Sequence, residues 1–272
     1  MDIIMFLKAL ILGIVEGITE FLPISSTGHL ILVDEFLKLS SDKSFTNAFE
    51  IIIQLGAILS VIVLFWNDLW PFCGTEEKKK KTWTLWSKIV VAVIPAAVLG
   101  FLFNDAIKKH LFNSHVVAIT LIFYGIVLIL LERYNAKKST FKINSVSSIP
   151  YAIAAAIGVF QCLSMVPGTS RSAATIIGAM LLGLSRGTAA EFSFFLAIPT
   201  MAGATGLTLF KSGFSFDLQQ WIGLSIGFVT SFLVAYAVIK FLMNFIKRHD
   251  FSVFGYYRII LGLIVLFLLW NK

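Results

Sequence analysis

The sequence predicts an all-α membrane protein built as an inverted-topology repeat, in which each half is one re-entrant helical hairpin plus three transmembrane helices. Hydrophobic residues make up 58% of the 272 residues and charged residues only 14%, whereas soluble domains are about half apolar and about a quarter charged. Long apolar runs recur without the alternation of a β-strand, and only helices or closed barrels satisfy the backbone in lipid. A similar pattern of broken apolar runs opens each half of the chain.

Residues 1–272 are expected to form a single polytopic membrane domain with repeat halves of about 1–140 and 141–272. The halves are related because residues 13–31 match residues 158–176 in sequence. Each half has one hairpin and an odd number of spans, so the two halves are expected to insert in opposite orientations. In membrane proteins of this design, the site lies where the broken helices meet near the midplane.

Each hairpin is predicted from apolar runs that are too short or too polar to span a membrane, which takes about 20 predominantly apolar residues. In the first half, residues 3–22 and 30–39 flank a break at residues 23–28, which include a proline and a glycine. In the second half, residues 149–166 end at the Pro-Gly pair 167–168, after which a second half-helix begins. Irregular backbone at this depth is tolerated only where it is buried in protein or lines a cavity.

Six longer apolar runs are expected to cross the membrane. They cover residues 45–65, 89–103, 116–131, 189–210, 218–243 and 251–270. The stretches 67–88, 104–114 and 132–148 are expected to be loops. Lys and Arg are enriched in the loops after the first, third and fifth spans, which places these loops in the cytoplasm and both termini outside. Lys108 and Lys109 depart from this rule.

The net charge of +7 is explained by the same orientation signal. The sequence contains no compact basic domain that would carry a groove-reading element, so we expect no nucleic-acid partner. We expect membrane lipid to surround the protein.

Two carboxylates lie inside the first apolar run. Glu16 and Glu20 are four residues apart, which places both on one face of a helix. Neighbouring anions repel one another at low dielectric, so one would stay protonated unless a cation joins them. Oxygen ligands favour Mg²⁺ or Ca²⁺, and we therefore predict a divalent cation bound by these two side chains. The alternative is an acid pair that Ser or Thr hydroxyls satisfy.

Ser25, Ser26 and Thr27 lie in the first break, and His29 follows it directly. Ser25 and Thr27 are candidate substrate-binding residues. A half-helix that starts here presents free backbone N–H groups and the positive end of its dipole, which suits phosphate. A hydroxyl beside a general base is a candidate nucleophile, and Glu20 or His29 would serve as that base. Ser25 alone is also explained as a helix N-cap, and His29 as a hydrogen-bonded packing residue.

The second break carries a matching polar segment. Its candidate substrate-binding residues are Gly168, Thr169, Ser170, Ser172 and Thr175, and its cation is Arg171. Glycine lets the backbone approach a ligand closely, and a guanidinium suits bidentate contact with phosphate. Arg171 is the only arginine that we place at a break, because Arg258 falls near the start of the last span. The alternative role for Arg171 is a salt bridge to Glu16 or Glu20.

The predicted site is suited to phosphoryl transfer. It combines two acids, a hydroxyl beside a base, a guanidinium and two helix N-termini. With water as the final acceptor, the predicted activity is that of a phosphatase. A site at membrane depth would take a lipid phosphate or diphosphate. The alternative is a transporter or flippase of the lipid carrier, since many transporters are built from inverted repeats. Such a carrier would bind phosphate but would not need an acid pair beside an activated hydroxyl.

Four segments resemble the undecaprenyl-diphosphate phosphatase family of bacitracin-resistance type: EGITEFLPISSTGH (16–29), QLGAILSV (54–61), PGTSRSAAT (167–175) and EFSFFLAIP (191–199). The resemblance implies hydrolysis of undecaprenyl diphosphate to undecaprenyl phosphate plus inorganic phosphate, with a divalent cation. This reaction would recycle the lipid carrier for cell-wall synthesis. It also implies a multi-pass protein of the bacterial inner membrane, and we expect the active site to open to the outer side.

The residues expected to act in catalysis are Glu16, Glu20, Ser26, His29 and Arg171. The resemblance favours Ser26 over its neighbours as the nucleophile, or as the residue that orients an attacking water. The second half has Gln161 and Met165 where the first half has the two acids. We therefore expect a catalytic first half and a phosphate-binding second half. The oligomeric state is left open, with a homodimer as one alternative.

Overall fold

The structure is a computed structural model that describes residues 3–136, 141–212 and 216–270. Over these residues the chain is helical without a β-strand, and one isolated β-bridge joins Ile143 to Leu184. The first half contains α1 (Ile3–Thr19), α2 (Ser26–Phe36), α3 (Lys43–Leu64), α4 (Trp66–Leu69), α5 (Glu76–Leu111) and α6 (Ser114–Ala136). The second half contains the 3-10 helix η1 (Val146–Ser148), α7 (Tyr151–Gln161), the 3-10 helix η2 (Cys162–Met165), α8 (Arg171–Leu181), α9 (Arg186–Ser212), α10 (Leu218–Phe245) and α11 (Ser252–Trp270).

Five of the described helices, α3, α5, α6, α10 and α11, are long and apolar enough to cross a membrane. The predicted all-α membrane fold is therefore confirmed. α9 forms over the range of the remaining predicted span but is not among these five, and Glu191 and Pro199 lower its apolar character. Residues 137–140, part of the predicted loop 132–148, lie outside the described residues.

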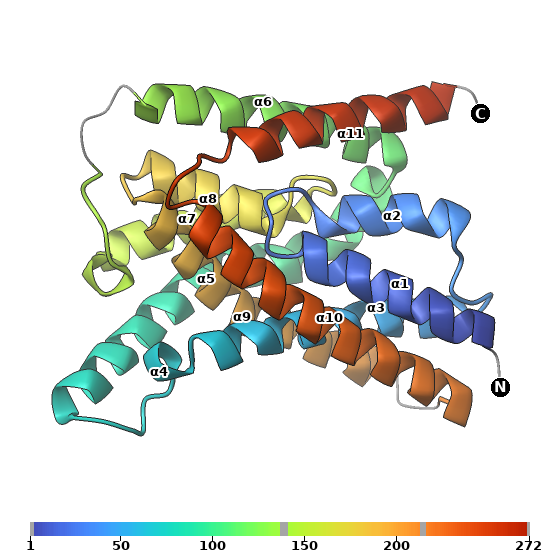
Figure 1. Ribbon diagram of the computed structural model, residues 1–272, viewed down its shortest axis with the longest axis horizontal. Helices are drawn as coiled ribbons and strands as arrows, with labels where there is room; N and C mark the ends of the chain where they lie inside the picture. The colour runs from blue at the N-terminus through green and yellow to red at the C-terminus, as the bar shows by residue number, and fades with distance from the viewer. Residues whose placement is uncertain (1–2, 137–140, 213–215, 271–272) are drawn as a thin grey trace.

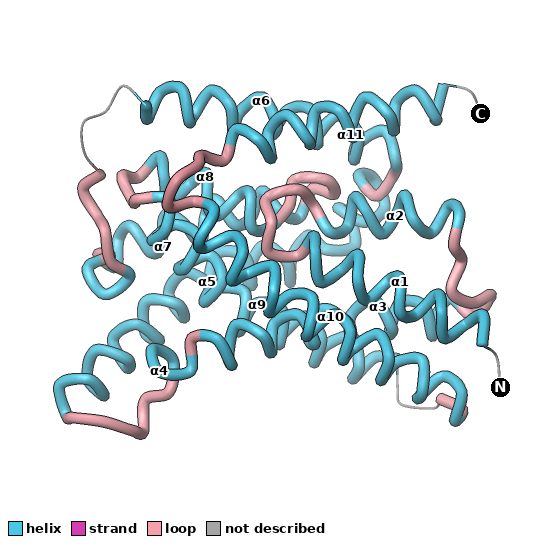
Figure 2. Tube along the Cα trace, viewed as in Figure 1, coloured by secondary structure: helices cyan, strands magenta, loops and turns pink. Residues whose placement is uncertain are grey.

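The two predicted hairpins enter the molecule from opposite ends (Figure 1). α1 starts at the end where both chain termini lie and runs inward to the first break, while α7 starts at the other end. The turns of both hairpins lie in the middle of the molecule, where Figure 2 shows them as loops between helices. The first helix of each hairpin packs on a long helix of the other half. In this way α1 of the first half packs on α10, and α7 of the second half packs on α5. This arrangement agrees with an inverted repeat, whose orientation in a membrane stays a prediction.

Much of two predicted loops is helical, because α5 extends into both 67–88 and 104–114. The prediction of loops there is wrong in these parts. Thr75 caps the start of α5 by accepting a hydrogen bond from a backbone N–H. In the lysine-rich first turns, Lys81 forms an ion pair with Glu77 at 2.7 Å, one helical turn away. Hydropathy locates the apolar part of a helix, but it does not identify polar turns that continue the same helix.

Close packing holds the end of α1 in the protein interior. At Gly13 of α1, helix α10 passes so near that an added Cβ atom would lie 2.7 Å from the carbonyl oxygen of Gly227. Beyond α1, the buried ring of Phe21 meets Phe194 of α9 edge-on, with ring centroids 5.2 Å apart. Since α1 carries Glu16 and ends directly before Glu20, these contacts help to determine where both acids lie.

Candidate active site

The half-helices that leave the two breaks both begin with a serine in the left-handed backbone region. The backbone angle φ is 75° at Ser25 and 71° at Ser170, and no other non-glycine residue in the described ranges has a positive φ. Each hydroxyl accepts a hydrogen bond from the backbone N–H three residues on, at Gly28 and Ala173, both at 3.2 Å. Because left-handed backbone is strained for serine, its presence at both breaks points to a functional site.

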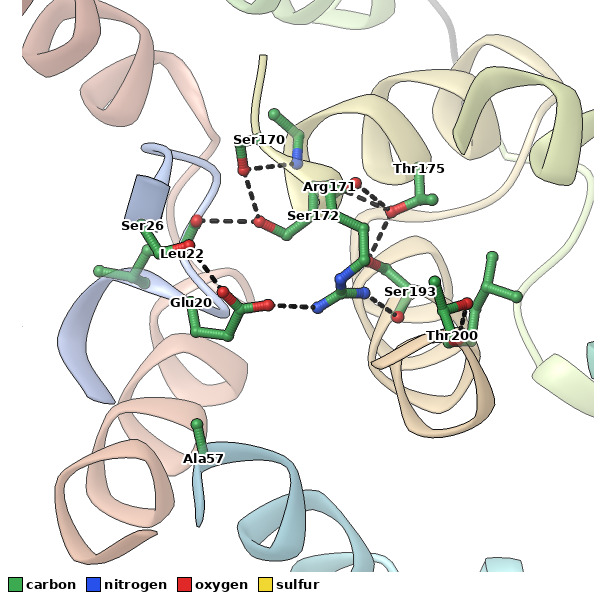
Figure 3. A network of polar contacts seen from close by, with 12 residues as sticks. Glu20, Leu22, Ser26, Ala57, Ser170, Arg171, Ser172, Thr175, Ser193 and Thr200 are labelled. Atoms are coloured by element: carbon green, nitrogen blue, oxygen red, sulfur yellow. Dashed lines mark hydrogen bonds and ion pairs between the residues drawn. The ribbon is translucent and has the colours of Figure 1, made fainter. Parts of the chain in front are cut away.

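Glu20 joins the two breaks (Figure 3). Its Oε2 accepts a hydrogen bond from Ser26 Oγ at 2.7 Å, and its Oε1 pairs with Arg171 Nη2 at 3.2 Å. The side chains of Glu20 and Arg171 are only 7% and 11% exposed, although the residues are 151 positions apart in sequence. The salt bridge that we gave as an alternative for Arg171 is therefore present, and it places the guanidinium beside the candidate nucleophile and its base.

Arg171 is held from its other side by α9. Its Nη1 donates to the carbonyl oxygen of Ser193 at 2.9 Å, and the hydroxyl of Ser193 lies 2.6 Å from that of Thr175 (Figure 3). Within the described structure, the buried Nε of Arg171 has no hydrogen-bond partner. The described contacts thus orient this guanidinium while its Nε stays without a protein partner. Ser193 was missed in the sequence because a serine in an apolar span carries no signal of its own.

The second turn is tied directly to the first. Ser172 Oγ donates to the carbonyl oxygen of Leu22 at 2.9 Å, and its other neighbour is the hydroxyl of Ser170, also at 2.9 Å. Gly168 has a φ of 84° and Thr169 is fully buried beside it. The residues of the second motif therefore lie between the two breaks, and their binding of substrate stays a prediction.

His29 faces away from the candidate nucleophile. Its Nδ1 lies 2.7 Å from the carbonyl oxygen of Ser25, and its Nε2 lies 2.6 Å from the hydroxyl of Tyr257 on α11. Since a carbonyl only accepts, Nδ1 carries the proton and Nε2 accepts from the tyrosine. Both ring nitrogens are therefore engaged elsewhere, and the base in contact with Ser26 is Glu20. Thr27 lies half-buried in the first turn of α2.

Glu16 is fully buried, and neither of its carboxylate oxygens has a hydrogen-bond partner in the described structure. An unpartnered buried carboxylate one turn from Glu20 fits a hard divalent cation, which prefers oxygen ligands. The described residues contain no group of three or more His, Cys, Asp or Glu side chains that could hold a metal ion. The chain would therefore supply two carboxylates, and substrate phosphate is the natural source of further ligands.

Arg258 of α11 contacts both breaks, so the prediction that Arg171 is the only arginine at a break is wrong. Its guanidinium is 0% exposed and donates to the carbonyl oxygens of Pro23 at 3.0 Å, Gly168 at 2.7 Å and Thr169 at 3.0 Å. The signal that could have identified it is the cost of an arginine inside an apolar span.

The chain is similar to named sequences over nearly its whole length. A sequence model described as "Bacitracin resistance protein BacA" matches residues 9–264. A Clostridioides difficile protein named undecaprenyl-diphosphatase 1 is 56% identical over 95% of this chain and 94% of its own. Proteins named undecaprenyl-diphosphatase in Enterococcus faecalis and Fusobacterium nucleatum are 53% and 55% identical, over 98% and 96% of this chain and 98% and 99% of their own. The chain therefore belongs to the bacitracin resistance protein BacA family.

Proposed function

We propose that this chain hydrolyses undecaprenyl diphosphate to undecaprenyl phosphate and inorganic phosphate, and so recycles the lipid carrier used in cell-wall synthesis. The observation that carries the proposal is the contact of Glu20 with both Ser26 and Arg171. It brings a hydroxyl, its base and a phosphate-binding cation together between two helix N-termini. The names of the relatives supply the substrate.

Ser26 is the nucleophile in this mechanism. As Ser26 Oγ attacks the terminal phosphorus, Glu20 Oε2 accepts its proton. The new Oγ–P bond forms while the bond from that phosphorus to the bridging oxygen breaks, and undecaprenyl phosphate leaves with the electron pair. Glu20 then gives this proton to the departing undecaprenyl phosphate. It next accepts a proton from the water that attacks the phosphoserine, and it returns a proton to Ser26 Oγ as the Oγ–P bond breaks and inorganic phosphate leaves.

The negative charge of the diphosphate is matched by this chain's own donors. Arg171 offers a permanent cation, and the first turns of α2 and α8 offer backbone N–H groups at the positive ends of their dipoles. Glu16 and Glu20 would hold a Mg²⁺ or Ca²⁺ ion, which when bound neutralises phosphate charge. Gly168, Thr169 and the hydroxyls of the second turn confine the phosphate beside Ser26.

We place the protein in the bacterial inner membrane with the active site opening to the outer, periplasmic side. The acid-bearing hairpin α1–α2 enters from the end where both termini lie, opposite to the lysine-rich start of α5 (Figure 1). The positive-inside rule assigns the lysine-rich end to the cytoplasm. Hydrolysis of substrate added outside sealed right-side-out vesicles would test this orientation. A homodimer stays a prediction that a mass measurement in detergent would test.

Phosphate release from undecaprenyl diphosphate by the purified protein in detergent tests the proposal. We expect cation-dependent release that falls at least about 10³-fold in Ser26→Ala, because catalytic residues that act together lose activity together. Ser225→Ala is a matched control, since Ser225 only back-bonds to Trp221 in α10. Near-full activity of Ser26→Ala would exclude the phosphoserine and leave an activated water. Lipid movement in liposomes without any phosphate release would support the flippase instead.

A further inference from the structure

Arg258 is a buried cation whose hydrogen bonds in the described structure all go to backbone carbonyls, and its guanidinium also lies over the ring of Tyr124, 5.9 Å from the centroid. Besides its contacts at the breaks, its Nε donates to the carbonyl oxygen of Leu121 at 3.4 Å and its Nη2 to that of Thr120 at 3.5 Å. No carboxylate lies within ion-pair distance of it in the described structure. A guanidinium cannot shed its charge in a protein, so burying one here is costly and calls for an explanation.

The carbonyls that Arg258 binds belong to the two turns that carry the site. The carbonyl of Pro23 lies in the first turn, two residues before the strained cap Ser25. The carbonyl of Thr169 lies in the second turn, directly before the strained cap Ser170. One planar group therefore bridges the two turns directly before their caps, beside the hydrogen bond from Ser172 to Leu22. The nucleophile and the phosphate-binding arginine are the residues that immediately follow these caps.

We propose that Arg258 is a positioning residue, which sets the two breaks in register so that Ser26 and Glu20 face Arg171. The inference rests on the proposed function. Arg258 acts through the backbone of the turns and not by contact with the reacting atoms. A guanidinium suits this task because its rigid planar fork reaches acceptors on two segments at once, which the single nitrogen of a lysine cannot reproduce.

Helices outside both hairpins support the same turns. α11 packs along α6, and the two helices lie side by side in Figure 1. From α6, Thr120 Oγ1 lies 2.7 Å from the carbonyl oxygen of Pro167, and its single proton is shared with the carbonyls of Val116 and Val117 at 2.8 and 3.0 Å. From α11, Tyr257 binds His29 in the first turn of α2. Residues of α6 and α11 therefore contact the turns of both hairpins, and Arg258 contacts both turns at once.

Arg258→Lys tests the proposal, with kinetics compared to the thermal midpoint in detergent. We expect a fall in kcat of about 10²-fold, the typical cost of misplacing reacting groups by about 1 Å. The KM should change far less, because Arg171 and the helix N-termini that bind phosphate remain. Arg186→Lys is the matched control, since Arg186 forms a bidentate pair with Glu132 away from the breaks. The control should lower the thermal midpoint without lowering kcat of the folded protein.

Thr120→Val provides a second test if Arg258→Lys does not fold. It removes one support of the second turn and keeps the shape of the side chain, so kcat should fall in the same direction but less. The proposal is overturned if folded Arg258→Lys, or in its place Thr120→Val, has the kcat of the wild type. An absence of phosphate release by the wild type would instead overturn the proposed function.

Discussion

Ser172 of the second hairpin donates a hydrogen bond to the backbone carbonyl of Leu22 in the first hairpin, at 2.9 Å. This bond closes the gap between two segments that are 150 residues apart. Because Leu22 lies two residues after Glu20, the bond also limits where the carboxylate can lie. The hydroxyl of Ser172 therefore acts on the site through the backbone of the other half.

Ser172→Ala should weaken the contact between the hairpins. The carbonyl of Leu22 keeps a hydrogen bond from the backbone N–H of Ile24 at 2.8 Å, so the variant loses one hydrogen bond, which contributes about 0.5–1.5 kcal/mol. We therefore expect a lower thermal midpoint and a fall in kcat of up to about tenfold. The measurement is thermal unfolding in detergent together with phosphate release. Ser170→Ala removes the neighbouring cap and serves as the comparison. An unchanged midpoint for Ser172→Ala would show that the hairpins are held by other contacts.

Glu20 and His29 are distinguished by comparing two isosteric changes. Glu20→Gln should lower kcat by about 10²–10⁴-fold, the usual contribution of a general base. His29→Gln loses only hydrogen bonds of about 1–2 kcal/mol each and should retain activity within about tenfold. Initial rates of phosphate release at saturating substrate give both values. If His29→Gln were the more damaging change, the assignment of the base to Glu20 would be wrong.

Glu16→Gln should change the response to cations more than it changes the fold. The variant keeps the size of the side chain but loses one charged ligand, so the Mg²⁺ or Ca²⁺ concentration for half-maximal activity should rise about tenfold or more. The measurement is a cation titration after treatment with a chelator. Glu191→Gln, which alters a half-buried acid of α9, should leave the titration unchanged. A normal titration of Glu16→Gln would remove Glu16 from the cation site.

Gly168→Ala should be among the most damaging single changes at the second break. Its φ of 84° is unfavourable for alanine, and the new Cβ would lie 2.1 Å from Thr120 Oγ1 and 2.7 Å from the carbonyl oxygen of Val117. The turn must move to relieve these contacts, which displaces Arg171 and lowers activity. Gly187→Ala is the control, because an added Cβ there meets nothing within 4 Å. Phosphate release and the yield of folded protein in size-exclusion chromatography measure both.

The two hairpins and their meeting could be predicted because breaks in apolar runs are local features of the sequence. A proline and a glycine after a short run mark each turn, and the repeat brings Glu20 toward Arg171. The choice of Glu20 as base could not be predicted, since it depends on the side-chain direction of His29. That direction is set by Tyr257, which is 228 residues away. Such a contact leaves no spacing or composition signal.

The contact of Arg258 with the two breaks was not predicted for the same reason. Its acceptors are backbone carbonyls, which every residue has, so its sequence neighbours do not disclose them. The extent of α5 was also missed, because its lysine-rich turns are polar and helical at once. Sequence patterns locate apolar segments and breaks well. They locate poorly the bonds from side chains to distant backbone.

The two serines with positive φ, one in each half, bear on how many substrate molecules one chain can bind. Ser25 and Ser170 repeat the same backbone turn in both halves, but the first hairpin carries Glu16 and Glu20 where the second has Gln161 and Met165. The backbone turn is thus repeated in the two halves, whereas the pair of carboxylates is not. We therefore expect one turnover site per chain that takes one diphosphate headgroup, so a tight-binding diphosphate analogue should titrate the protein at one equivalent per chain.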